Sequence, residues 1–204
     1  MPGRTGGACS TGSVTVTTTY LHQLHPTDLR PARPPQRPAA IVRVGEPSPE
    51  FARFLYTAVG GDWYWTGRLP WSLAQWTGWL SRPGSEMWVS WIDGAPAGYV
   101  ELGAEVRDDA THAEIVHFGL LPRFIGRGLG GQLLTEGIRN AWTLHDRCPE
   151  LRPVTRVWLH TCTLDGPHAL QNYVARGFRA YDTTQDDTSV PDAPPGPWPG
   201  AHGS

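Results

Sequence analysis

The stretch Phe118-Gly119-Leu120-Leu121-Pro122-Arg123-Phe124-Ile125-Gly126-Arg127-Gly128-Leu129-Gly130-Gly131 decides the fold of this chain. An apolar run over residues 114–120 predicts a central strand before it, and an apolar stripe over residues 128–144 predicts a helix after it. Such a strand, loop and helix present backbone N–H groups and a helix N-terminus to an anion. The glycines remove Cβ atoms where a phosphate would lie, and Arg123 and Arg127 add positive charge. We therefore predict a phosphate-binding loop.

Two cofactors are compatible with this loop. Gly126-x-Gly128-x-x-Gly131 satisfies the dinucleotide fingerprint, which also requires an acid about 20 residues further on, at the end of the next strand. Here the predicted helix continues to Leu144, and the next strand ends near Asp165, which is much too late. A nucleotide-cofactor oxidoreductase is therefore the weaker alternative, and a strand-to-helix turn without a ligand is another.

Two motifs resemble one enzyme family. Phe118-x-Leu120-x-Pro122 followed by Arg123-x-x-Gly126-x-Gly128 resembles the signature of the GNAT superfamily of N-acetyltransferases, in which R/Q-x-x-G-x-G/A binds the pyrophosphate of acetyl-CoA. Asn172-Tyr173-x-x-x-Gly177-Phe178 independently resembles the later helix and strand of that family. The order of predicted elements over residues 41–181 also fits it.

The periodicities and the resemblance predict an α/β fold, with a GNAT-like mixed, mostly antiparallel sheet of six or seven strands flanked by about four helices. Strands are expected at residues 14–21, 41–44, 87–92, 97–102, 114–120, 154–163 and 177–181. Helices are expected at residues 49–59, 71–80, 128–144 and 165–176. We expect one domain over residues 14–183, between disordered tails at residues 1–13 and 184–204.

The resemblance implies where acetyl-CoA binds. The strand before the loop would separate from the next strand, and the pantetheine would enter the gap. Backbone groups of the strand would hold the pantetheine and polarise the thioester carbonyl. The implied cofactor-binding residues are Phe118, Gly119, Leu120, Arg123, Ile125, Gly126, Arg127, Gly128, Leu129, Gly130, Gly131 and Asn172.

Tyr173 is the first of two predicted catalytic residues. The resemblance implies that its hydroxyl is the general acid that protonates the leaving thiolate, and the alternative is an aromatic ring packed on the sheet. Asn172 would hydrogen-bond to the pantetheine or phosphate arm, and a solvated helix position is equally consistent.

Glu114 is the second, as the predicted general base. It begins the strand that leads to the loop, and strict alternation places it on the same face as Phe118 and Leu120. Some members of the family carry a strand glutamate here that deprotonates the amine. An exposed strand-end glutamate is the alternative, and Glu101 and Glu105 are other candidate bases.

The histidines and cysteines indicate no metal site. Alternation places His117 on the face opposite Glu114, where a packed histidine is expected, and no HxxE or HxH pattern is present. The 3 cysteines are scattered without CxxC spacing, which indicates a reducing compartment and a cytoplasmic protein.

Composition argues against nucleic-acid and membrane partners. The net charge of -2 gives no electrostatic case for nucleic acid. The apolar stretches fall far below the ~18 residues of a membrane span, so no membrane contact is expected. The N-terminus also lacks an apolar export segment.

Many of the 10 tryptophans lie in one block, which includes Trp63-Tyr64-Trp65, Trp71, Trp76 and Trp79. In the family's layout this block forms a wall of the acceptor site and could bind an amine by cation–π contact. The alternative is that these rings belong to the core or to a dimer surface. Glu86 could attract a cationic substrate or could simply be solvated.

We therefore predict an acyltransferase, an N-acetyltransferase that moves an acetyl or short acyl group from acyl-CoA to a primary amine by direct attack. The acceptor would be a small-molecule or peptide amine, and the sequence leaves a homodimer open. The alternative from another class is a CoA-binding module without catalysis.

Overall fold

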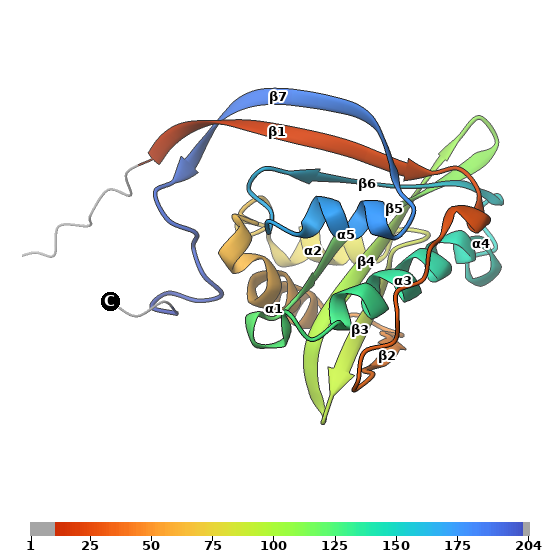
Figure 1. Cartoon of the computed structure of the whole chain (residues 1–204), viewed down its shortest axis with the longest axis horizontal. Helices are drawn as coiled ribbons and strands as arrows, with labels where there is room; N and C mark the ends of the chain where they lie inside the picture. Colours follow the sequence, from red (N-terminus) through yellow and green to blue (C-terminus); the bar gives the residue numbers. More distant parts are fainter. Residues whose placement is uncertain (1–10, 202–204) are drawn as a thin grey trace, which may run out of the picture.

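A computed structural model of the chain describes residues 11–201 and shows one sheet with helices on both faces (Figure 1). The strands are β1 Thr11–Gln23, β2 Ala40–Arg43, β3 Glu86–Ile92, β4 Ala95–Arg107, β5 Ala110–Leu120, β6 Val154–Cys162 and β7 Arg179–Pro191. The helices are α1 Pro49–Gly60, α2 Leu73–Leu80, α3 Leu129–Trp142, α4 Leu144–Arg147 and α5 Ala169–Ala175, with short 3-10 turns at η1 Pro26–Asp28, η2 Gly61–Trp63 and η3 Pro122–Phe124.

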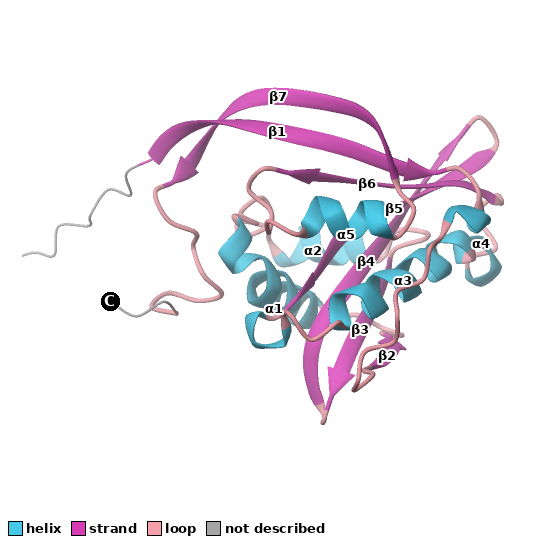
Figure 2. Ribbon diagram, in the orientation of Figure 1, coloured by secondary structure: helices cyan, strands magenta, loops and turns pink. Residues whose placement is uncertain are grey.

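The 7-stranded sheet has the order β2-β3-β4-β5-β6-β1-β7. Neighbouring strands are antiparallel except β5 and β6, which are parallel. The predicted mixed, mostly antiparallel sheet with flanking helices is therefore confirmed (Figure 2).

Side-chain caps fix where the first two helices begin. The Ser48 hydroxyl accepts a hydrogen bond from the Phe51 N–H at 3.2 Å, and Pro49 occupies the first turn of α1. Ser72 and Gln75 form a reciprocal capping box at the start of α2. These caps orient the two helices that cover one face of the sheet.

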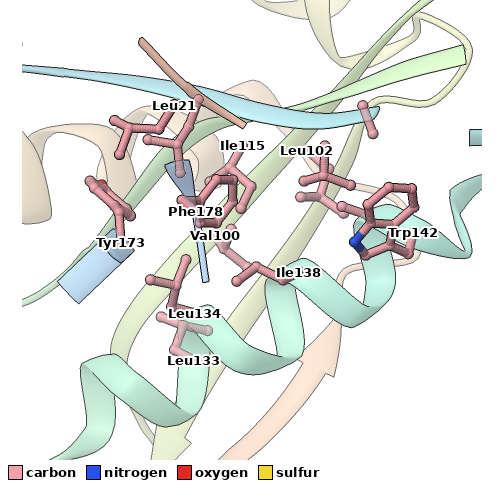
Figure 3. Packing of buried hydrophobic residues seen from close by; sticks show 14 of the residues in the cluster. Leu21, Val100, Leu102, Ile115, Leu133, Leu134, Ile138, Trp142, Tyr173 and Phe178 are labelled. Carbon is pink, nitrogen blue, oxygen red and sulfur yellow. The ribbon is translucent and has the colours of Figure 1, made fainter. Parts of the chain in front are cut away.

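The larger apolar cluster lies between the sheet and α3. Leu133, Leu134 and Ile138 of α3 are fully buried. They belong to one cluster with Val100 and Leu102 of β4 (Figure 3). Truncating one of these leucines to alanine would cost ~2–5 kcal/mol.

A second cluster lies on the opposite face of the sheet. Leu55, Tyr56 and Val59 of α1 are buried there together with Met87 of β3 and Tyr99 of β4. Because Tyr99 belongs to this cluster and its neighbour Val100 to the larger one, β4 carries a core on each face.

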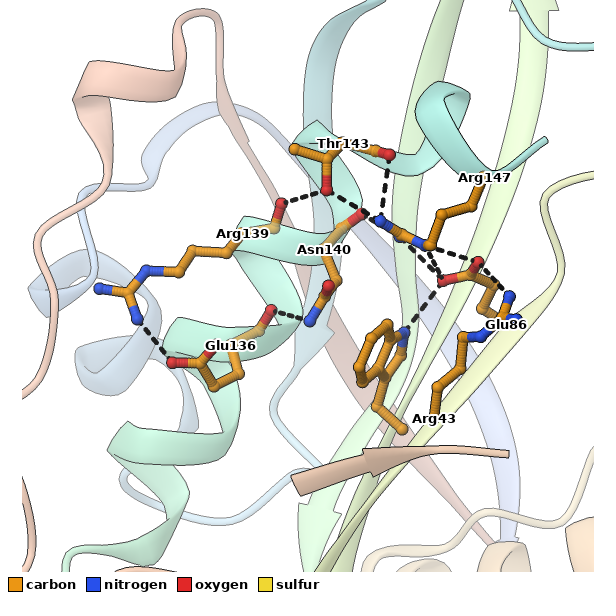
Figure 4. Close-up of polar contacts among 8 residues, drawn as sticks. Arg43, Glu86, Glu136, Arg139, Asn140, Thr143 and Arg147 are labelled. Carbon is orange, nitrogen blue, oxygen red and sulfur yellow. Dashed lines mark hydrogen bonds and ion pairs between the residues drawn. The ribbon is translucent and has the colours of Figure 1, made fainter. Parts of the chain in front are cut away.

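Glu86 is a structural carboxylate at the start of β3. It accepts hydrogen bonds from Arg43 Nη1 at 3.1 Å and from Arg147 Nε at 2.9 Å (Figure 4). Trp88 Nε1 also donates to it, at 3.0 Å. Burial favours the protonated form, but these bonds outweigh it and lower the pKa of Glu86. Its charge is thus paired within the fold, where it joins α4 to β2 and β3.

The expected C-terminal tail is wrong for residues 184–191. They continue β7, which pairs with β1 as far as Pro191 opposite Thr11. Threonine and valine favour extended backbone, and the aspartates of this edge strand remain exposed, so their charge does not oppose pairing. Residues 11–13, expected in the other tail, likewise belong to β1. Residues 1–10 and 202–204 lie outside the described residues.

Beyond β7 the chain returns to the end of α1, where the Gly196 N–H donates to the Gly61 carbonyl at 3.0 Å. Among residues 11–201, no helix has the length and apolarity needed to cross a bilayer.

Candidate active site

The main cleft begins where β5 and β6 separate. Their parallel pairing starts at Thr111 with Val154 and ends at Glu114 with Trp158. Beyond that point a cleft of about 890 Å³ lies between the strands. The separation implied by the family resemblance is therefore present, and the edge of β5 that faces β6 exposes backbone groups to the cleft.

The glycine-rich loop forms one end of the cleft. Gly126 and Gly128 have φ values of 82° and 76°, a left-handed conformation that favours glycine. Gly128 precedes the first turn of α3, and within residues 11–201 no side chain caps that turn. The N–H groups of the first turn are consequently available to an anion, and the helix dipole adds positive potential.

Most of the predicted cofactor residues line the cleft. They are Phe118, Gly119, Leu120, Ile125, Gly126, Gly128, Gly130, Gly131 and Asn172. Leu129 instead belongs to the core, with 2% of its surface exposed, because its position in the helix points it beneath the loop. Arg123 and Arg127 lie outside the lining, with their guanidinium groups 4.7 and 5.6 Å from the centroid of the Phe124 ring.

Tyr173 lines the cleft from α5 and also packs on the core. Its ring centroid lies 6.0 Å from that of Phe118 and 6.3 Å from that of Phe178. Burial, with the charge of Asp165 adding to it, raises the pKa of Tyr173 above its ordinary value. The phenol therefore keeps its proton at neutral pH. The packed ring is therefore confirmed and it also lines the cleft, while the role of general acid stays a prediction.

Glu114 lies on the face opposite the predicted one. The register between β4 and β5 shifts after Glu101, which pairs with His117, and Val116 becomes an extra residue in β5. A β-bulge of this kind reverses the alternation of side chains beyond it. Glu114 therefore shares a face with His117 and not with Phe118, and the prediction from strict alternation is wrong.

Glu114 lines a separate cavity of about 210 Å³ together with Trp79 and Arg82. Burial, reinforced by the neighbouring carboxylate of Glu101, raises the pKa of Glu114 to about 7. One oxygen lies 3.8 Å from His160 Nδ1, and His160 lines the main cleft.

A buried polar cluster that the sequence did not predict is centred on Glu101. Only 2% of Glu101 is exposed. Arg68 Nη1 donates to both its oxygens, at 2.9 and 3.0 Å, and Trp79 Nε1 donates to Oε1. His117 Nδ1 lies 3.1 Å from Oε2. Burial raises the pKa of Glu101, but His117 and Arg68 outweigh it and lower the pKa to about 2.

The aromatic block divides between this cluster and the cleft. The Arg68 guanidinium carbon lies 4.0 Å from the centroid of the Trp79 ring and 4.7 Å from that of Trp71. Trp63, Tyr64 and Trp65 instead line the cleft. Cation–π contact is thus present, but its cation is an arginine of the protein itself.

Among the residues that the structure describes, no group of three or more His, Cys, Asp or Glu side chains could hold a metal ion.

Comparison with known proteins identifies the family. The sequence model of the Acetyltransferase (GNAT) family matches residues 52–178, more than half of the 204-residue chain. The chain therefore belongs to the GNAT acetyltransferases, a family that transfers acyl groups from acyl-CoA and generally uses acetyl-CoA as co-substrate. No curated protein matches the chain.

Solved structures share the fold. A GCN5-related N-acetyltransferase from Kribbella flavida is 21% identical over 85% of this chain and 57% of its own, with a TM-score of 0.52. One from Sphaerobacter thermophilus is 13% identical over 89% and 54%, with a TM-score of 0.53. An aminoglycoside acetyltransferase from an uncultured soil metagenomic sample is 13% identical over 67% and 86%, with a TM-score of 0.53. This chain thus spans little more than half the length of the first two.

Proposed function

We propose that this protein is an N-acetyltransferase that moves an acetyl or other short acyl group from acyl-CoA to a primary amine by direct attack. The observation that supports this most strongly is the continuous cleft between β5 and β6. The glycine-rich loop lines one part of the cleft, and Trp63, Tyr64 and Trp65 line another. An extended acyl-CoA and an amine could therefore meet inside it.

The loop residues fit a pyrophosphate. Gly126 and Gly128 have the backbone conformation that turns N–H groups toward an anion, and α3 begins beside them. A Cβ at Gly130 would contact only the ends of the Leu120 and Phe118 side chains, at 3.6 and 3.9 Å, so the backbone stands open to the cleft. Acyl-CoA would supply the activated thioester.

The backbone of β5 would hold the acyl end. Over residues 118–120 this strand is paired with β4 on one side, and its other edge faces the cleft. N–H groups on that edge can bind the pantetheine and stabilise the oxyanion that forms when the amine attacks the thioester carbon.

Tyr173 would complete the reaction as the general acid. The carbon–nitrogen bond forms, the carbon–sulfur bond breaks, and the departing thiolate takes the phenolic proton. The buried phenol is protonated at neutral pH, as this role requires.

The test is an acceptor screen with acetyl-CoA. Arylalkylamines, amino acids, aminoglycosides and peptide N-termini would each be incubated with the protein, and released CoA thiol and acetylated product would be measured. Acetylation of an amine is the expected result. Tight acetyl-CoA binding without any acetylated product would instead indicate a CoA-binding module, and absence of acetyl-CoA binding would contradict both functions.

A further inference from the structure

His117 is a histidine of β5 itself, and among the described residues it lines the cleft together with His160 and His168. It precedes Phe118 in β5, lines the cleft, and keeps 16% of its side chain exposed. Its ring centroid lies 4.7 Å from that of Trp65 and 5.1 Å from that of Tyr56. Two aromatic rings thus restrict the orientation of the imidazole.

Glu101 determines which nitrogen of His117 carries the proton. An ionised carboxylate only accepts hydrogen bonds, so His117 Nδ1, at 3.1 Å, must carry the proton between them. In the neutral imidazole the lone pair is then on Nε2. Arg68 and Trp79 hold the carboxylate from the other side, which fixes it in place.

From this arrangement we infer that His117 is the general base that removes the proton from the attacking amine, with Glu101 as its positioning residue. The inference rests on the proposed acetyl transfer. As the amine nitrogen bonds to the thioester carbon, its proton moves to His117 Nε2. The thiolate that leaves takes the proton of Tyr173, and solvent then returns both residues to their starting states. The net products are one amide and one CoA thiol.

Burial leaves the imidazole neutral at neutral pH. Glu101, Arg68, Tyr56, His160 and Asp165 are the titratable and charged groups around it. Burial is the largest effect, and it lowers the pKa of His117. The charges of Glu101 and Asp165 raise this pKa, whereas the charge of Arg68 lowers it further. The lone pair is therefore present above the ordinary histidine pKa of about 6.5. The rival base Glu114 lines the other cavity.

The first test is His117→Asn with the accepted amine. An asparagine amide can still donate to Glu101, as Nδ1 does, but it offers no base at the position of Nε2. We expect kcat/KM to fall about 100- to 10,000-fold, with CoA affinity unchanged, and the acid limb of the pH–rate profile to disappear. The matched control is His112→Asn on the same strand, outside the cleft, which should preserve both rate and profile.

Glu101→Gln tests the positioning residue. Because the Glu101 carboxylate raises the pKa of His117, its removal should shift the acid limb of kcat/KM to lower pH. A purely structural carboxylate would change the amount of folded protein and leave the limb in place.

Chemical rescue distinguishes loss of the base from misfolding of the variant. His117→Ala should regain activity with added imidazole, and the rescued rate should follow the pKa of substituted imidazoles. Retention of rate and acid limb in His117→Asn, or loss of the acid limb in Glu114→Gln alone, would overturn the assignment of the base. A wild-type protein that binds acetyl-CoA and acetylates no amine would refute the proposed function itself, and this assignment with it.

Discussion

Under the proposed function, the cleft has a cofactor end at the glycine-rich loop, which is made of backbone, and an acceptor end at His117, which borders a cluster of buried side chains. At the cofactor end, Gly126 and Gly128 turn the chain and α3 presents its uncapped first turn. Beside the acceptor end, Glu101 is enclosed by Arg68, Trp79 and His117, of which His117 lines the cleft. The first end requires the absence of side chains, and the second requires several specific ones in mutual contact.

The two regions should therefore respond differently to substitution. At a loop position where a side chain has room, such as Gly130, a substitution should alter ligand affinity more than stability. A buried charged cluster loses stability when one member is removed, because the remaining charge is left without its partner.

The largest expected effect is on stability, in Arg68→Met. Removing one member of a buried ion pair typically costs ~3–5 kcal/mol. Urea unfolding at neutral pH would measure this loss. Arg82→Met is the matched control, because the exposed Arg82 stacks on the same Trp79 ring at 3.3 Å and its loss should cost less than ~1 kcal/mol. Equal losses in the two variants would contradict the central role of the Glu101 cluster.

At the cofactor end, Gly130→Glu should weaken CoA binding by at least ~100-fold, about 2.7 kcal/mol. The new carboxylate would occupy the positive end of α3 in place of the phosphate, and the same placement favours the helix, so stability should be retained. Calorimetric titration with CoA measures the affinity. Gly78→Glu adds the same charge at an open position of α2 and should bind CoA normally. Normal binding by Gly130→Glu would exclude the loop as the phosphate site.

Tyr173→Phe should lower turnover by ~100-fold, the lower end of the range for general acid catalysis. The ring keeps its contacts with Phe118 and Phe178, so stability and CoA affinity should stay close to wild type. Such a pattern marks an interaction made mainly in the transition state. Steady-state kinetics with an accepted amine would show it, and an unchanged turnover would remove the phenol from the mechanism.

The smallest expected effect concerns Glu114 and pH. Its folded-state pKa of about 7 lies above the unfolded value, so folding is favoured at low pH and loses stability as pH rises through 7. Between about pH 5 and pH 8, wild type should lose roughly 2 kcal/mol more stability than Glu114→Gln does. Denaturant unfolding at both values measures this. The control Glu105→Gln should keep the pH dependence of wild-type stability. If Glu114→Gln also keeps it, the raised pKa of Glu114 is refuted.

The sequence predicted the cofactor end because its signal is local. One short stretch contains an apolar strand, glycines that need positive φ and a following helix. The Asn172-Tyr173 motif is a second, independent signal for the same family. The acceptor end has no such signal. Arg68 and Glu101 are 33 residues apart, and Glu101 and His117 are 16 apart. Only the folded sheet brings them together.

The errors have physical causes of the same kind. The face of Glu114 depends on the bulge at Val116, which arises from pairing with β4 and has no signature in β5 itself. The end of β7 was predicted as disordered because polar and acidic residues are common both in disordered tails and in exposed edge strands. Pairing with β1 distinguishes the two.

Amide hydrogen exchange with and without acetyl-CoA tests the central claim most directly. If the cleft binds acyl-CoA as proposed, exchange should slow at residues 125–131, where N–H groups would meet phosphate, and at residues 115–120, where β5 would gain a hydrogen-bonding partner. The paired ends of β1 and β7, remote from the cleft, should be unchanged. Slowing confined to other regions, or none at saturating acetyl-CoA, would contradict the claim.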